Sequence, residues 1–165
     1  SRVPREVEVF LSDYSAGMLA EARGYLGGDE RFCFSEIDAQ SLPFADASFD
    51  LVVANHMLYH VPDIPRAIGE MRRVLLPGGH LAAATNGADH MMELYDLAHQ
   101  FDSGIYRGNE SAARFGLQNG DALLKPVFAN RELFIYEDAL WITEALPLVQ
   151  CYVSLWGLGA WDARR

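Results

Sequence analysis

The sequence feature that most constrains the fold is a nearly continuous run of apolar and β-branched residues, Phe49-Asp50-Leu51-Val52-Val53-Ala54. A strand with one wet face alternates polar and apolar residues, and this run does not. It is therefore typical of a strand covered by helices on both faces, as in a parallel α/β sheet. Asn55 follows directly, at the carboxyl end, where open parallel sheets place ligand-contacting residues.

Helix and strand patterns alternate along the chain around this run. The sequence predicts strands over residues 7–11, 32–37, 49–54 and 80–85, helices over residues 16–26, 63–75 and 89–101, and a last helix capped by Thr143. Such alternation predicts a mostly parallel α/β sheet with right-handed crossovers. Residues 133–136 and 139–142 are predicted to be further strands.

We expect a single domain over residues 1–165. Residues 103–121 are rich in Gly, Asn and Ser and show no clear period, so they are predicted to be a lid or a plain surface connection. In the helix over residues 63–75, Asp63 is the predicted N-cap. Along that helix we expect an inward set (Ala67, Ile68, Met71, Val74 and Leu75) and an outward set (Arg66, Glu70 and Arg73).

Composition excludes several classes of function. The 165 residues are half apolar, which suits one domain with a sizeable core. The formal net charge of −10 argues against a nucleic-acid surface. No apolar stretch approaches the roughly 20 residues of a membrane span, and no signal-peptide core opens the chain. Cys33 and Cys151 lie in apolar runs and are predicted to be buried thiols, so we expect a cytoplasmic protein.

Polar residues stand at three predicted strand ends, which is the layout of a binding site. Asp13 and Asp38 each close a strand, as Asn55 does. Each also has a plainer interpretation, because Asp13 could cap the following helix and Asp38 could stabilise a turn. Asp50 begins its strand, and we interpret it as structural.

Three motifs in order resemble the class I S-adenosylmethionine-dependent methyltransferases, specifically the branch that methylates small molecules. The motifs are Asp13-Tyr14-Ser15-Ala16-Gly17-Met18-Leu19, the stretch from Asp38-Ala39 through Ser41-Leu42-Pro43-Phe44 and Asp46 to Ser48-Phe49-Asp50-Leu51-Val52-Val53, and Arg73-Val74-Leu75-Leu76-Pro77-Gly78-Gly79. The resemblance implies a Rossmann-like methyltransferase fold, an S-adenosylmethionine cofactor leaving as S-adenosylhomocysteine, and a small-molecule acceptor.

The resemblance also implies roles for single residues. Asp13 would accept both ribose hydroxyls, and Asp38 would accept the adenine amino group. The Ala39 backbone would lie at the adenine ring edge, with Met18 against the adenine face and Asn55 near the methionine portion. At helical spacing, Met18 could equally be a core residue.

His60 is the candidate catalytic residue, because it follows the buried strand closely and histidine can take a proton near neutral pH. The alternative is a partly buried, hydrogen-bonded histidine beside Tyr59. His56 and His60 have the i,i+4 spacing of metal ligands on a helix, but no third ligand is evident, so no metal site is predicted.

The family's Gly-rich turn and the strand before it are not found upstream of Asp13, so the sequence predicts a methyltransferase fold truncated at its N-terminus. That strand is central in the family's sheet, and without it two strands expose unpaired edges. The gap would close by re-pairing within the chain or through another chain, which predicts self-association through sheet edges. We expect the 165 residues alone to bind cofactor weakly or not at all and to be inactive.

Two other functions stay open at this point. One is a non-catalytic, methyltransferase-like module that acts through protein contacts, which the absent glycine turn favours. The other is a nicotinamide-dependent Rossmann enzyme, in which Asp13 would also meet a ribose. The pattern from Leu42 to Asp50 is foreign to that second class.

Overall fold

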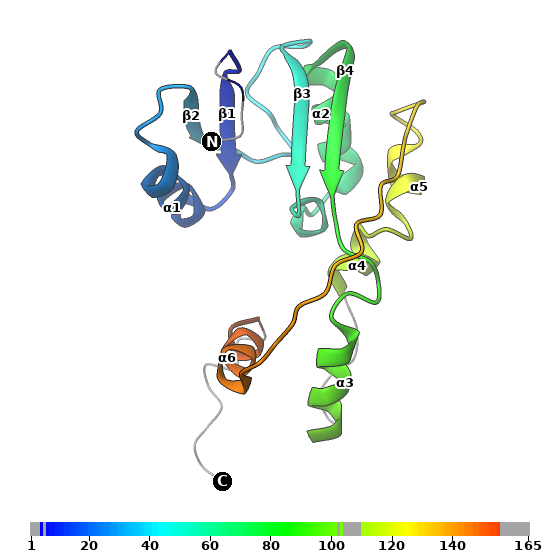
Figure 1. Ribbon diagram of the computed structural model, residues 1–165. Helices are drawn as coiled ribbons and strands as arrows, with labels where there is room; N and C mark the ends of the chain where they lie inside the picture. Colours follow the sequence, from blue (N-terminus) through cyan, green and yellow to red (C-terminus); the bar gives the residue numbers. More distant parts are fainter. Residues whose placement is uncertain (1–3, 5, 102, 104–109, 156–165) are drawn as a thin grey trace. The chain divides into compact units, whose positions relative to one another are not determined.

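The computed structural model describes residues 4, 6–101, 103 and 110–155, with no side-chain description for residues 101 and 151–155. The chain forms two compact units, residues 1–131 and residues 132–165 (Figure 1). The first unit carries all the strands of the described chain.

The first unit begins with a parallel pair of strands, here called the N-terminal ribbon. Strand β1 (Val9–Asp13) pairs with β2 (Phe32–Glu36) in a register that runs from Val9 opposite Phe32 to Asp13 opposite Glu36. Helix α1 (Ala16–Leu26) connects them, and the Ser15 hydroxyl caps it by accepting from the Met18 amide at 3.4 Å. This confirms the predicted strand–helix–strand order.

Cys33 corrects one prediction, because its side chain is exposed and not buried. Successive side chains of a strand point to opposite faces, and Phe32 and Phe34 take the more covered face of β2. The side chain of Cys151 lies outside the described residues.

A second parallel pair, the central ribbon, contains the apolar run. Strand β3 (Phe49–Asn55) pairs with β4 (Leu75–Ala84), joined by the 3₁₀ turn η1 (Leu58–His60) and helix α2 (Ile64–Val74). In Figure 1, α2 lies behind β3 and β4. Asp63 is the N-cap of α2, as predicted, and accepts from the Arg66 amide at 3.0 Å.

Strand β4 begins earlier than the sequence predicts. The sequence predicts that residues 77–79 separate the helix from a strand over residues 80–85, but β4 starts at Leu75, directly after α2. The register then jumps, because Phe49 lies opposite Leu75 while Leu51 lies opposite His80. Gly78, at φ +84°, supplies the left-handed backbone of this bulge, a conformation that favours glycine.

The core of the first unit gathers around α2. The buried cluster consists of Ala54, Leu58, Val61, Ile64, Ala67, Ile68, Met71 and Phe115. The inward positions predicted for α2 are therefore confirmed, Val74 included, at 1% exposure. Burial of this apolar stripe against β4, η1 and α5, with Ala54 of β3 in the same cluster, is what holds the helix in place.

Among the described residues, β1 is hydrogen-bonded only to β2, and β3 only to β4. Aromatic rings link the two ribbons, because the Phe10 ring centroid lies 5.7 Å from that of Phe44 and 5.6 Å from that of Phe49. The sequence predicts two ways to close the gap left by the absent strand, re-pairing within the chain or pairing with another chain. In the described residues β1 and β3 do not pair with each other, so the first way is not adopted.

Three shorter helices complete the first unit: α3 (Met92–Phe101), α4 (Glu110–Arg114) and α5 (Gly120–Leu124). Within residues 103–121, residues 104–109 lie outside the description. In the remainder, Ala112 and Phe115 are buried. The Thr85 hydroxyl donates to the Phe115 carbonyl at 2.6 Å, and the Leu117 amide donates to the Asn86 carbonyl at 3.2 Å.

In the second unit, residues 132–144 form neither helix nor strand, and α6 (Ala145–Leu155) follows. The helix after Thr143 is confirmed, but it begins at Ala145, so Glu144 and not Thr143 directly precedes it. The strands predicted over residues 133–136 and 139–142 are wrong, because a strand forms only with a partner ladder and the described residues provide none there.

Candidate functional site

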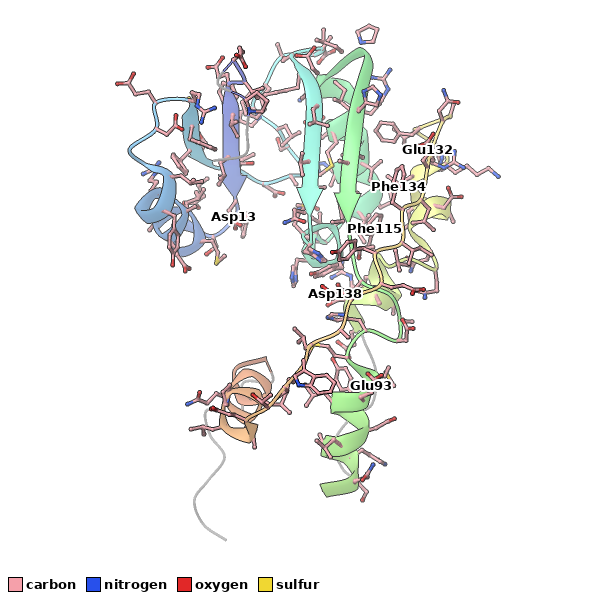
Figure 2. The ribbon with its side chains drawn as sticks, in the orientation of Figure 1. Asp13, Glu93, Phe115, Glu132, Phe134 and Asp138 are labelled. Atoms are coloured by element: carbon pink, nitrogen blue, oxygen red, sulfur yellow. The ribbon has the colours of Figure 1, made fainter. Side chains whose placement is uncertain are left out.

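Asp13 and Asp38 come to the same end of the N-terminal ribbon. Asp13 is the last residue of β1, and Asp38 follows β2 by two residues. The Ile37 amide donates to the Asp13 carbonyl at 3.0 Å and so joins the two strand ends. Both aspartates are half-buried. Figure 2 shows Asp13 at the tip of the β1 arrow, where the carboxyl ends of the ribbon lie.

The Asp13 carboxylate also organises its own turn. Its Oδ1 accepts from the Ser15 amide at 2.8 Å, immediately before α1. This hydrogen bond supports the plainer interpretation, in which Asp13 stabilises the start of the helix. An ionised carboxylate has about four acceptor positions, so one backbone bond does not prevent it from meeting two hydroxyls.

Asp38 is held by Gln40. Its Oδ1 accepts from the Gln40 amide at 2.8 Å, and the Gln40 Nε2 donates to both carboxylate oxygens, at 3.0 and 3.1 Å. The hydrogen bond from the Gln40 backbone, followed by the one from its side chain, lowers the pKa of Asp38. Asp38 is thus a carboxylate that already accepts from an NH₂ group.

Ala39 and Met18 lie in different surroundings. Ala39 is half-buried and packs against the core cluster. Met18 is 55% exposed on α1, so the alternative that it is a core residue is wrong. Leu19, next to it, is the buried residue of that helix.

Asn55 and His60 stand beyond the central ribbon. Asn55 is exposed at the end of β3, opposite Ala84. His56 follows it at φ +50° and turns the chain, while its amide donates to the Ala84 carbonyl at 3.0 Å. In Figure 1 the arrowheads of β1, β3 and β4 point the same way, so Asn55 ends its strand on the same side as Asp13.

His60 closes η1 and is exposed, with its ring centroid 4.5 Å from that of Tyr59. His60 therefore lies beside Tyr59, as the alternative interpretation predicts, but its imidazole is exposed and not partly buried. Burial does raise the pKa of Tyr59, so that phenol stays neutral over a wide pH range. Within the described part of the chain, no group of three or more His, Cys, Asp or Glu residues is placed to hold a metal.

Sequence reasoning missed the polar side of α2, which it assigned to solvent. Arg66, Glu70 and Arg73, here called the polar stripe, bind the loop that follows Asp38. Glu70 accepts from the Leu42 amide at 2.9 Å, and Arg73 donates to Glu70 at 2.8 Å through both Nε and Nη2. The sequence did contain an indication of this contact: three charged residues share one face of the predicted helix, and the loop before β3 contains an acidic residue, Asp46.

The Glu70 carboxylate gives the fold a pH dependence on the acid side. Hydrogen bonding to the Arg73 side chain, and then to the Leu42 amide, lowers the pKa of Glu70 from 4.5 to about 2. Because the folded-state pKa is the lower one, this stabilisation is fully present above about pH 4.5 and is lost as the pH falls toward about 2. We expect about 1–2 kcal/mol, less than the full shift implies, because the side chain keeps 22% exposure and water screens the pair.

Urea unfolding of the wild type and of Glu70→Gln, between about pH 3 and about pH 7, measures this contribution. The difference in unfolding free energy should shrink as the pH falls. Glu93→Gln is the control, because Glu93 is exposed on α3, and it should show little difference at any pH (Figure 2). A Glu70→Gln difference that is constant with pH would contradict the assignment.

Residues 3–83 match the family model of a methyltransferase domain, which covers both ribbons except the last residue of β4. The chain belongs to the class I S-adenosylmethionine-dependent methyltransferases. The motifs on which the resemblance depended lie within the matched residues, and membership decides against the nicotinamide-dependent alternative.

Individual methyltransferases are similar over longer stretches. The malonyl-(acyl-carrier protein) O-methyltransferase of Enterobacter lignolyticus (strain SCF1) is 34% identical over 134 residues, which cover 81% of this chain and 52% of that protein. The ubiquinone/menaquinone biosynthesis C-methyltransferase UbiE of Xanthomonas campestris pv. campestris is 40% identical over 106 residues, covering 61% of this chain and 42% of that protein. The chain thus spans about half the length of the curated relatives it matches.

The solved structure of the YcgJ protein from Bacillus subtilis superposes with a TM-score of 0.51 at 25% identity, over 72% of this chain and 51% of that one. The Rossmann-like methyltransferase fold with parallel strands is therefore confirmed. Among the described helices, none is both long and apolar enough to cross a membrane.

Proposed function

We propose that this protein takes part in transfer of a methyl group from S-adenosylmethionine to a small-molecule acceptor. The observation that carries the proposal is the pair of half-buried aspartates at one end of the N-terminal ribbon, in a chain of the methyltransferase family. The acceptor class is proposed from relatives that are named as a malonyl-(acyl-carrier protein) O-methyltransferase and as a C-methyltransferase of ubiquinone/menaquinone biosynthesis. The proposed compartment is the cytoplasm.

The residues present fit the adenosine half of this cofactor. Asp38 already accepts from the NH₂ group of Gln40, which is the same kind of donor as the adenine amino group. Asp13 is half-buried and keeps acceptor capacity for ribose hydroxyls. We assign Ala39 to the adenine edge, the exposed Met18 to the adenine face and Asn55 to the methionine portion.

When bound, the cofactor supplies an electrophilic methyl group on a good leaving group, so orientation of the acceptor provides much of the rate. We propose that the chain's own contribution is to fix that orientation and to accept a proton. His60 is the proposed proton acceptor, because its imidazole is exposed just beyond the end of β3. Self-association through the edges of β1 and β3 stays a prediction, supported by their lack of a second partner strand among the described residues.

We expect Asp13→Ala and Asp38→Ala each to weaken S-adenosylhomocysteine binding by about 1.5–3 kcal/mol. A charge-assisted hydrogen bond to a ligand contributes about this much. Titration calorimetry of the two variants and the wild type, each as the full-length protein, is the measurement. Asp138→Ala is the matched control, because Asp138 is exposed and lies in the second unit (Figure 2). Affinity that is unchanged in both aspartate variants would remove the cofactor assignment.

A further inference from the structure

The polar stripe of α2 bonds to alternate residues of the loop between the two ribbons. Arg66 Nε donates to the Gln40 carbonyl at 2.9 Å. Glu70 accepts from the Leu42 amide at 2.9 Å. One helix face thus binds the loop within a few residues of Asp38.

Arg73 extends the same pattern along the loop. Its Nη2 donates to the Leu42 carbonyl at 2.9 Å, and its Nη1 donates to the Phe44 carbonyl and to Asp46 Oδ1, both at 2.8 Å. The guanidinium therefore bonds to backbone carbonyls and to carboxylates at once. Only a rigid, planar five-donor group can do this, and lysine cannot.

The polar stripe meets the loop from one side of the helix. Arg66, Glu70 and Arg73 are four and three residues apart and therefore share one face of α2. The loop opposite is not extended, because residues 39–41, 44 and 46–47 form turns or bends. Residues 40, 42, 44 and 46 of the loop are the ones bonded.

The same helix also reaches Asp38 through Gln40. The Gln40 Oε1 accepts from the Asp63 amide, at the start of α2, at 3.0 Å, while the Gln40 Nε2 donates to the Asp38 carboxylate. Asp38 is thereby connected to α2 by one side chain, and the rest of the loop is connected by the polar stripe. The loop has little freedom to move independently of the helix.

We infer that Glu70 and Arg73 are positioning residues, which hold the loop after β2 so that Asp38 and Ala39 meet the ligand in one fixed geometry. The inference rests on the proposed function and extends it, because neither residue would contact the cofactor. A carboxylate that must be ordered at each encounter binds more weakly than one held in place beforehand.

The experiment compares Arg73→Lys, Arg73→Ala and Glu70→Gln with the wild type in two measurements. The first is S-adenosylhomocysteine affinity by calorimetry, where Arg73→Ala should weaken binding by roughly 10- to 100-fold and Arg73→Lys by less. The second is amide hydrogen exchange of Leu42, which needs no ligand and should accelerate in the Arg73→Ala and Glu70→Gln variants. Arg72→Gly is the control, because it loosens the same helix without touching the loop.

The outcomes separate the inference from the proposed function. Faster Leu42 exchange with weaker binding, both absent in Arg72→Gly, would establish the positioning role. Unchanged binding in Arg73→Ala, with the wild type still binding, would overturn the inference and leave the proposed function intact. If Arg72→Gly weakens S-adenosylhomocysteine binding as much as Arg73→Ala does, the effect is a general loss of helix structure, and the inference is also overturned. A full-length wild-type protein that does not bind at all would remove the proposed function, and the inference with it.

Discussion

Phe115→Ala should lower the free energy of unfolding by about 3–5 kcal/mol. The ring is 2% exposed and packs in the cluster that also contains Leu58 and Ile68. Its removal loses the transfer free energy of an aromatic side chain and leaves a cavity between η1, α2 and the α4–α5 segment. Urea unfolding of the full chain, followed by circular dichroism, measures the change.

Phe134→Ala is the matched control, since that ring is 82% exposed in the second unit (Figure 2). Its substitution should change stability by no more than about 0.5 kcal/mol. A loss of less than about 1 kcal/mol for Phe115→Ala would mean that the segment after α4 is not part of the core.

The second large effect is expected at Gly116, where a side chain has no room. A Cβ atom placed there would lie 2.5 Å from the Ala112 carbonyl oxygen and 2.9 Å from the Ala112 Cα. Both are backbone atoms, so relief requires the end of α4 to move. That movement would also disturb the 2.7 Å hydrogen bond from the Gly116 amide to Asn119 Oδ1. We expect Gly116→Ala to destabilise the protein by about 1–3 kcal/mol.

Gly69→Ala provides the comparison for Gly116→Ala within the same unit. Gly69 lies inside α2, and a Cβ there would meet nothing within 4 Å. Alanine in place of a helical glycine should therefore stabilise the protein by about 0.5–1 kcal/mol. Thermal melts of the two variants should move in opposite directions, and a shift in the same direction for both would contradict the steric argument.

The parts of the fold predicted correctly from sequence are those set by local periodicity. The strand β3, the capping by Asp63 and the inward positions of α2 all follow from the residues nearest to them. The predicted cover on both faces of β3 is wrong for the described chain, because Leu51 and Val53 are 54% and 63% exposed and only Ala54 of the strand is buried. Asp13 and Asp38 were placed at strand ends in the same way, because each ends an apolar run.

The features that were missed depend on residues far apart in the chain. The start of β4 at Leu75 needs β3 as a partner, and local sequence around Gly78 indicated only a break. The polar stripe looks like an ordinary solvated face until the loop 26 to 31 residues earlier is placed against it. Strands over residues 133–142 were predicted from β propensity alone, which cannot supply the partner that a strand requires.

The uneven distribution of the core between the two ribbons has a consequence for cooperativity. Among the described residues, Leu19 is the one buried hydrophobic residue before Ala54, whereas the central ribbon and α2 contain most of the others. Proteins open locally where few apolar contacts resist, so the N-terminal ribbon should be the foldon of lower stability. Asp13, the last residue of β1, belongs to that foldon, whereas Asp38 is connected to α2 through Gln40. A ligand that binds both aspartates would therefore suppress local opening of the N-terminal ribbon, and part of its binding free energy would be used to order Asp13, while Asp38 is already held in place.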